Sequence, residues 1–237
     1  MTSQPNQHAE TADFEFAALS EARNYRAALL QDFGLHLRGN VLEVGAGIGQ
    51  ITAALLETPA IQNLTSIEPD AAFCSRLRSI FPEHRIVEGT IADLKSDVSW
   101  NAILSVNVLE HIEDDDGELA EYNRLLRPTH GALCLFVPSR QEIYAPIDRD
   151  FGHFRRYSKA ALKHKLALAG FKKIRIHYYN FPGYFLWWLN FCLLRKRAFD
   201  IASVRLFDKV LFPAIHGFET HVLRPPIGQS LIVIATT

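Results

Sequence analysis

A short apolar segment that runs straight into three closely spaced glycines constrains this chain more than any other feature. Residues 40–44 read NVLEV, which is typical of a buried strand, and Gly45, Gly47 and Gly49 follow at once. A helical pattern begins at Ile48, so the glycines form the turn between a strand and a helix. Glycine lets the backbone approach a ligand closely, and the first turn of a helix offers free N–H groups. The pattern therefore predicts a ligand-binding loop.

An acidic residue follows this loop at the end of the next predicted strand, residues 64–67, where Glu68 precedes Pro69. Ligands of open α/β sheets bind at the carboxyl ends of the strands, and a carboxylate there can accept hydrogen bonds from ribose hydroxyls. The dinucleotide fingerprint would place its third glycine at position 50, which is Gln50, so the G-x-G-x-G spacing argues against a nicotinamide cofactor. The order of these elements predicts an adenosine-containing ligand.

The rest of the chain alternates between short apolar segments and segments with helical periodicity. Further strands are predicted over residues 85–88, 102–106, 132–137, 172–178 and 230–235, and helices over 15–33, 48–56, 70–80, 117–126 and 158–169. Short apolar strands that alternate with helices indicate a parallel sheet covered on both faces. Residues 1–14 are expected to be a flexible N-terminus, and 15–237 a single domain in which 180–228 form a helical cap.

Composition excludes several classes of protein. Apolar residues make up 48% and charged residues 22%, which is ordinary globular usage. The net charge of −1 gives no global basic field for nucleic acid. The three cysteines are far apart and the N-terminus has no secretory signal, so a reducing, cytoplasmic location is expected.

Three segments together resemble the class I S-adenosylmethionine-dependent methyltransferases. They are LEVGAGIG at 42–49, Glu68, and SVNVLEHI at 105–112, and the resemblance covers roughly residues 25–178. It implies a Rossmann-like, seven-stranded α/β sheet that is mostly parallel and ends in an antiparallel strand. It also implies S-adenosylmethionine as cofactor and S-adenosylhomocysteine as product.

The resemblance further implies which residues hold the cofactor. In that family the glycine loop wraps the methionine part, the acid binds ribose, and residues after the third strand hold adenine. Carried over by position, the cofactor-binding residues are Gly45, Ala46, Gly47, Gly49, Glu68, Pro69, Thr90, Ile91 and Asn107. Many relatives have aspartate at the position of Thr90, and the next acid in this chain is Asp93.

Two histidines are the candidate catalytic residues. Methyl transfer needs aligned reactants, and a general base only where the acceptor must lose a proton. His111 follows the fourth strand and His153 lies in the loop after the fifth, and an imidazole titrates near neutral pH. The alternative for His111 is that it caps its loop and hydrogen-bonds the backbone.

The expected acceptor is a small molecule methylated at oxygen or nitrogen, with contacts at Tyr144, Arg155, Tyr184 and Trp187. Arg155 would clamp an anionic group on the acceptor. The alternative for this loop is an internal network in which two acids, Asp148 and Asp150, pair with Arg155 and Arg156. The acidic residues 113–116 after His111 predict the solvated start of a helix and no metal site.

The apolar segment 181–194, which is followed by the basic residues 195–197, has three interpretations. It is a cap over the acceptor pocket, a homodimer interface, or an in-plane helix in peripheral contact with a membrane. Polar and proline interruptions leave it too short to span a bilayer. The membrane interpretation leads to one functional alternative, an acceptor that is lipid-linked or membrane-borne. Independently of this segment, the chain could be a non-catalytic S-adenosylmethionine-binding partner subunit.

Overall fold

The computed structural model describes residues 22–94, 98–196, 200–221 and 225–237. The expected flexible N-terminus and the first residues of the predicted helix 15–33 lie outside this part of the chain. Within it, seven strands form one sheet: β1 (Gly39–Val44), β2 (Ile61–Glu68), β3 (Arg85–Glu88), β4 (Ala102–Val106), β5 (Ala132–Pro138), β6 (Lys173–Tyr179) and β7 (Ser230–Thr236).

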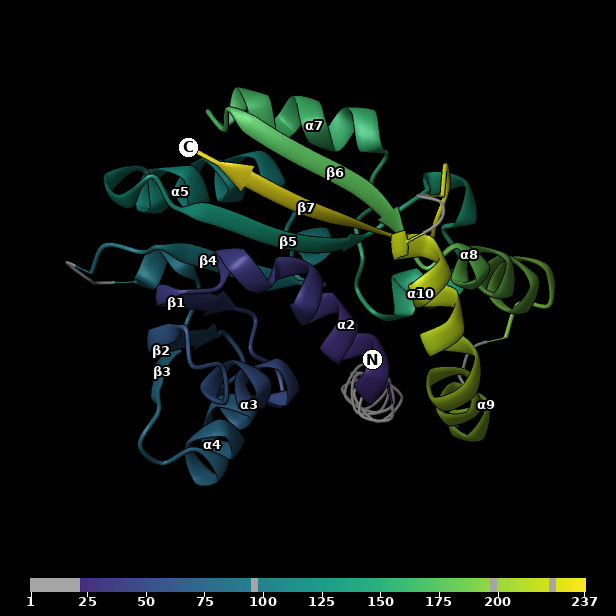
Figure 1. Cartoon of the computed structure of the whole chain (residues 1–237), viewed down its shortest axis with the longest axis horizontal. Coiled ribbons are helices and arrows are strands. Elements are labelled where there is room, and N and C mark those ends of the chain that lie inside the picture. The colour runs from purple at the N-terminus through teal and green to yellow at the C-terminus, as the bar shows by residue number, and fades with distance from the viewer. Residues whose placement is uncertain (1–21, 95–97, 197–199, 222–224) are drawn as a thin grey trace, which may run out of the picture.

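The strands are ordered β3-β2-β1-β4-β5-β7-β6, and Figure 1 shows them side by side. Neighbouring strands from β3 to β5 are parallel, whereas β7 runs antiparallel to both β5 and β6. This arrangement confirms the predicted Rossmann-like α/β fold with an antiparallel last strand. It also places the carboxyl ends of β1, β2 and β4 at one edge of the sheet.

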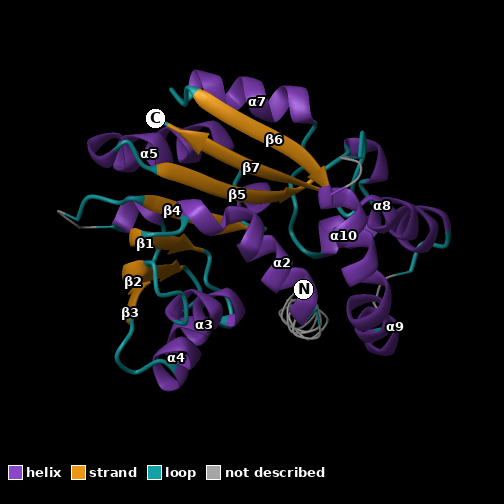
Figure 2. Cartoon of the chain, in the orientation of Figure 1, coloured by secondary structure: helices purple, strands orange, loops and turns teal. Residues whose placement is uncertain are grey.

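Helices cover both faces of the sheet (Figure 2). The α-helices are α2 (Arg23–Phe33), α3 (Gln50–Leu56), α4 (Ala71–Ile80), α5 (Asp115–Leu126), α6 (Pro146–Asp150), α7 (Lys159–Leu168), α8 (Phe181–Trp187), α9 (Ile201–Leu206) and α10 (Phe212–His221). Short 3-10 turns are η1 (Gly34–His36), η2 (Ile91–Asp93), η3 (Leu109–His111), η4 (Arg127–Thr129) and η5 (Gln141–Ile143). Two π-helical segments, η6 (Trp188–Leu193) and η7 (Phe207–Leu211), continue α8 and α9.

The core is divided between the two faces of the sheet. On one face α5 and α7 bury Leu119, Tyr122, Leu162 and Leu166 against the strands. On the other face α2, α3 and α10 bury Leu29, Phe33, Leu55 and Phe212. Strands β5 and β7 are almost completely buried, as expected for strands packed on both faces.

Local sequence explains where several helices begin. The helix predicted from residue 48 begins at Gln50, because Gly49 adopts a left-handed conformation that ends the loop. The helix predicted from residue 117 begins at Asp115, because the Asp114 side chain accepts a hydrogen bond from the N–H of Gly117. Ser158 caps α7 as predicted.

The segment 180–228, predicted to be a cap, is mostly helical in its described part, and these helices are called the cap below. It consists of α8, η6, α9, η7 and α10, which lie together beyond the end of β6 and the start of β7 (Figure 1). A small apolar cluster fastens it to the loop after β5: Ile143, Ala145, Ile147, Trp187 and Phe191. None of the described helices has both the length and the apolar character needed to cross a bilayer.

Candidate functional site

The glycine loop between β1 and α3 has a backbone that only glycine adopts easily. Gly45 and Gly49 have φ angles of 75° and 86°. A Cβ atom at Gly45 would lie 2.3 Å from Cγ2 of Val108, so any larger residue would push the loop off its neighbour. The loop therefore lies flat against the segment that follows β4, with its backbone facing the carboxyl edge of the sheet.

The carboxylate of Glu68 joins this loop to the end of β2. Its Oε2 atom accepts a hydrogen bond of 2.7 Å from the N–H of Gly47, and its Oε1 atom accepts one of 2.9 Å from the backbone N–H of Asp70. Burial raises the pKa of Glu68, and the two N–H donors act against that rise. The predicted ribose-binding acid is thus held in place at the rim of the predicted methionine-binding loop, next to the exposed Pro69.

The expected adenine side lies at the end of β3. The N–H and Oγ1 of Thr90 both donate to Oδ2 of Asp93, each at 2.9 Å, and Ile91 is buried. Asp93 therefore supplies a carboxylate next to Thr90, at the strand end where many relatives have an aspartate. This proximity arises from the 3-10 turn η2, which brings the later acid back onto the strand end.

Asn107 follows β4 and has a left-handed backbone with φ of 53°. Its N–H donates to the carbonyl of Phe136 at 2.9 Å, and the residue lines a cavity. Asparagine is one of the few residues other than glycine that adopt this backbone readily, so the chain can turn here directly after β4.

Sequence reasoning missed the role of Glu43, which sits on β1 just before the glycine loop. It is buried and accepts hydrogen bonds from the hydroxyl groups of Thr52 and Ser66. Burial raises the pKa of Glu43 to about 7, although these hydroxyls oppose the rise. The signal in the sequence was an acid in the middle of an apolar strand.

A cavity of about 440 Å³ lies beneath the cap, at the carboxyl ends of β4 and β5. Phe136 and Asn107 line it from the sheet, Glu110 and His153 from the loops after β4 and β5, and Trp187 from α8. Of the acceptor contacts predicted from the sequence, the structure therefore places Trp187 on this cavity.

His153 belongs to a buried polar cluster at the wall of the cavity. Its Nδ1 atom lies 3.0 Å from Oδ1 of Asp148, and Arg156 donates to the same carboxylate. Arg156 also lies over the ring of Trp187, with 4.3 Å from Cζ to the ring centroid. The network expected between the acids and arginines of this loop is thus present for the pair Asp148 and Arg156.

The two candidate histidines lie together. The ring centroids of His111 and His153 are 4.7 Å apart in an edge-to-face arrangement. Burial and the neighbouring imidazole lower the pKa of His111 to about 4, so its ring is neutral near pH 7. One ligating atom from each of Glu110, His111 and His153 lies within 4.8 Å of the other two.

The other predicted acceptor residues are placed around this region. Arg155 pairs with Asp115 at 2.8 Å and does not line the cavity. The hydroxyl of Tyr144 donates to the carbonyl of His153, and Tyr184 packs edge-to-face on Phe185. The structure brings these side chains to the surroundings of the cavity rather than to its lining.

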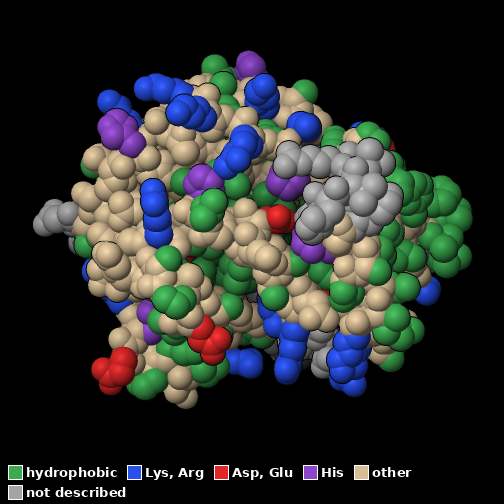
Figure 3. All heavy atoms as spheres, in the orientation of Figure 1, with side chains coloured by type: hydrophobic (Ala, Val, Ile, Leu, Met, Phe, Trp, Pro, Cys, Tyr) green, Lys and Arg blue, Asp and Glu red, His purple; other side chains and the backbone are tan. Residues whose placement is uncertain are grey.

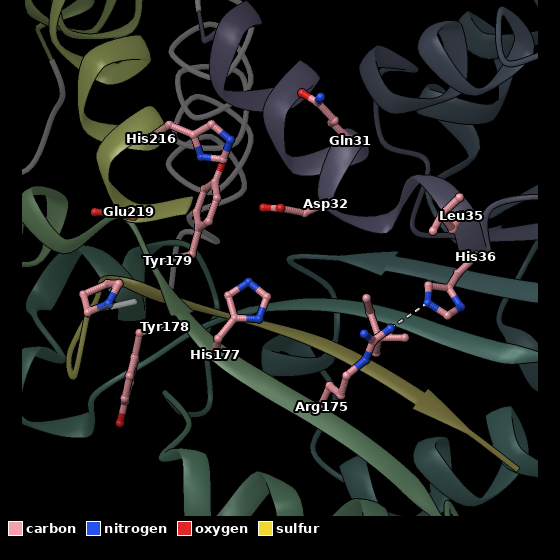
Figure 4. A pocket seen from close by; sticks show the side chains of 12 residues that line it. Gln31, Asp32, Leu35, His36, Arg175, His177, Tyr178, Tyr179, His216 and Glu219 are labelled. Atoms are coloured by element: carbon pink, nitrogen blue, oxygen red, sulfur yellow. Dashed lines mark hydrogen bonds between the residues drawn. The ribbon is translucent and has the colours of Figure 1, made fainter. Parts of the chain in front are cut away.

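A second cavity of about 350 Å³ lies between α2, β6 and α10 (Figure 4). Asp32, His177 and His216 line it, and Arg175 contacts His36 at its edge with 2.9 Å between Nη2 and Nε2. It contains none of the residues predicted from the sequence.

The outer surface of the cap exposes many large apolar side chains. Figure 3 shows hydrophobic side chains gathered at the end of the molecule that α8 forms. Leu193, Leu194 and Trp188 are 58%, 56% and 46% exposed, and the exposed Arg195 and Lys196 follow them.

Comparisons with known proteins agree with this architecture. Residues 16–176 match the methyltransferase-domain family Methyltransf_23. A probable S-adenosylmethionine-dependent methyltransferase of Mycolicibacterium smegmatis is 29% identical over 136 residues, which are 56% of this chain and 52% of that protein. The reducing polyketide synthase Preu2 of Preussia isomera is 30% identical over 108 residues, 42% of this chain and 5% of the synthase.

This chain therefore spans about half the length of one of these relatives and a small part of the other. Among solved structures, a SAM-dependent methyltransferase from Archaeoglobus fulgidus has a TM-score of 0.56 and 16% identity, covering 93% of this chain and 94% of that one. The chain belongs to the methyltransferase-domain family and has the fold of the class I S-adenosylmethionine-dependent methyltransferases.

Proposed function

We propose that this chain transfers the methyl group of S-adenosylmethionine to an oxygen or nitrogen of an acceptor bound in the cavity beneath the cap. The observation that carries the proposal is the glycine loop fastened to Glu68 at the carboxyl edge of the sheet. This edge is where open α/β sheets bind ligands, and the 440 Å³ cavity adjoins it.

The residues at this edge fit the cofactor. The loop residues Gly45, Ala46, Gly47 and Gly49 have no side chain larger than a methyl group, which leaves room for the methionine part to approach the backbone. Glu68, with Pro69 beside it, offers remaining lone pairs to the ribose hydroxyls, and Thr90 and Ile91 border the adenine side. Asn107 separates the cofactor side from the acceptor cavity. When bound, S-adenosylmethionine supplies an electrophilic methyl group on a sulfonium.

The chain itself supplies alignment, exclusion of water and activation of the acceptor. Trp187 and Phe136 form apolar walls of the cavity. We assign activation of the acceptor to His111 and His153, the two imidazoles at its edge. Support comes from the contact between His153 and Asp148, which fixes the imidazole through Nδ1 and leaves Nε2 for chemistry.

For an anionic small-molecule acceptor, the assignments of Tyr144, Arg155 and Tyr184 remain proposals. Arg155 would have to exchange its ion pair with Asp115 for the acceptor. The Asp115 side chain is only 4% exposed, so the exchange is opposed by the cost of leaving this buried carboxylate with Lys165 as a remaining cationic partner.

Binding calorimetry with S-adenosylhomocysteine tests the proposal. Wild type is expected to bind with a Kd in the micromolar range, and Gly45→Ala is expected to bind at least about 10-fold more weakly, because its Cβ meets Val108. Gly34→Ala is the matched control, since a Cβ at Gly34 meets nothing within 4 Å.

The melting temperature of each variant separates lost binding from lost folding. Equal binding by the two glycine variants, or no binding by a folded wild type, would contradict the proposal. Transfer of labelled methyl groups into fractionated cell extracts then separates an enzyme from a non-catalytic binding subunit.

A lipid-linked acceptor is a second candidate, favoured by the apolar outer surface of the cap. Leu186 and Lys196 line the cavity and are also exposed, so the cavity and this surface share residues. A lipid chain lying on the cap could therefore present a headgroup to the cavity.

A further inference from the structure

We propose that Glu110, His111 and His153 form a binding site for a divalent transition-metal ion, with Zn²⁺ as the best match. The proposal rests on the proposed function and deepens it, because the ion would activate the acceptor. One carboxylate oxygen and two imidazole nitrogens are a ligand set that catalytic zinc sites use, with the fourth position left open.

The geometry is close to that of a metal site. The three ligating atoms lie within 4.8 Å of one another. Tetrahedral zinc with bonds of about 2.1 Å holds its ligand atoms about 3.4 Å apart. Side-chain rotations that move the ligating atoms by on the order of 1 Å therefore complete the site.

The orientation of His153 is an independent observation that points to a ligand. The side chain is more than nine-tenths buried. Its Nδ1 atom contacts the carboxylate of Asp148, while its Nε2 atom is buried with no hydrogen-bond partner among the described residues. A carboxylate behind a metal-binding imidazole is the usual arrangement, since it fixes the ring and makes the other nitrogen more basic.

The backbone holds the two loops of the cluster together. The N–H of Phe154 donates to the carbonyl of Glu110 at 2.8 Å, which couples the loop after β5 to η3. The guanidinium of Arg156 lies close to this cluster, and its positive charge is neutralised by its ion pair with Asp148.

The site faces the acceptor. Glu110 and His153 both line the cavity, so an open coordination position lies on that side. An acceptor O–H placed there would lose its proton to solvent water at a lower pH than in bulk. Its oxygen would then form the bond to the methyl carbon while the carbon–sulfur bond breaks, with the electron pair left on sulfur as a thioether.

Cobalt(II) titration of the EDTA-dialysed full chain tests the site, because Co²⁺ at a low-symmetry nitrogen and oxygen site absorbs visible light. Wild type is expected to show saturable absorbance at one Co²⁺ per chain that added Zn²⁺ abolishes. His153→Gln and Glu110→Gln are expected to bind Co²⁺ at least about 100-fold more weakly. His164→Gln, which removes an exposed histidine on α7, is expected to bind as wild type does.

Binding of S-adenosylhomocysteine is measured on the same samples. Wild type that binds this nucleoside but gives no saturable cobalt absorbance overturns the metal site and leaves the proposed function standing. Cobalt absorbance that is unchanged in His153→Gln also overturns it. Folded wild type that fails to bind the nucleoside overturns the proposed function, whatever the cobalt result.

Discussion

Glu43 makes the stability of the strand beside the glycine loop depend on pH. Its carboxyl group is buried beneath the loop, with Thr52 and Ser66 donating to the same oxygen. Burial favours the neutral form, which raises the pKa to about 7 from 4.5. Between these values the folded state binds more protons than the unfolded state. The contribution of Glu43 to stability is therefore full below pH 4.5 and is lost as the pH rises through 7.

Glu43→Gln is expected to remove this dependence on pH. Glutamine keeps an acceptor for both hydroxyls but cannot ionise. The free energy of unfolding of the variant, relative to wild type, should rise on the order of 2 kcal/mol between pH 4.5 and pH 8. Urea unfolding at both pH values measures it. Glu57→Gln, an exposed acid at the end of α3, serves as control. A relative stability that does not change with pH would disprove the assignment.

The contacts of individual side chains also decide how the acidic run after His111 is interpreted. Asp115 and Asp116 pair with Lys165, and Asp114 caps α5, so the acidic run begins a helix as predicted, although Asp115 is buried rather than solvated. Its neighbour Glu110 belongs to a different cluster, because it lies on η3 and faces the cavity.

At the scale of elements, the junction between β6 and the cap depends on Asn180. It has φ of 60°, and its side-chain oxygen accepts from the N–H of Gly183 while its amide donates to Gln229. Glu219 on α10 accepts from the N–H groups of Asn180 and Phe181. The first turn of α8 is thus tied to both β7 and α10.

Two substitutions of Asn180 separate the contribution of its side-chain hydrogen bonds from the strain of its left-handed backbone. Asn180→Gly loses the side-chain hydrogen bonds and should lower the free energy of unfolding by about 1 kcal/mol. Asn180→Ala loses the same bonds and also strains the left-handed backbone, so it should be about 1 kcal/mol less stable than the glycine variant. Urea unfolding measures both, and equal stability of the two variants would show that the backbone is not strained.

At the scale of the whole molecule, one end presents an apolar surface flanked by cations. The exposed side chains of η6, including Trp188 and Leu193, stand beside Arg195 and Lys196. Apolar and basic side chains together favour the interface of an anionic bilayer over a purely aqueous surface.

Co-sedimentation with vesicles of anionic and neutral lipids tests this surface. Wild type is expected to bind anionic vesicles, and more weakly as salt is raised, because the cations contribute. Trp188→Ser combined with Leu193→Ser should lower binding about 10-fold or more. Leu35→Ser removes a 90% exposed leucine outside the cap and should change nothing. Binding that the double variant retains would refute membrane docking through η6.

The sequence alone determined the fold class and located the glycine loop and Glu68, which are predicted to hold the cofactor. The glycine loop, Glu68 and the strand ends follow from local rules, since each glycine or acid lies next to the strand that positions it. Element boundaries shifted by a few residues where caps such as Asp114 decide the first turn.

Only the tertiary structure decided which side chains line the cavity beneath the cap. Glu110 and His153 are far apart in the chain, and they meet because the loop after β5 bonds to η3 through Phe154. The same packing pairs Arg155 with Asp115 and Arg156 with Asp148. A sequence pattern shows which side chains exist and which strand they follow, but the partner of a loop residue depends on how two distant loops pack together.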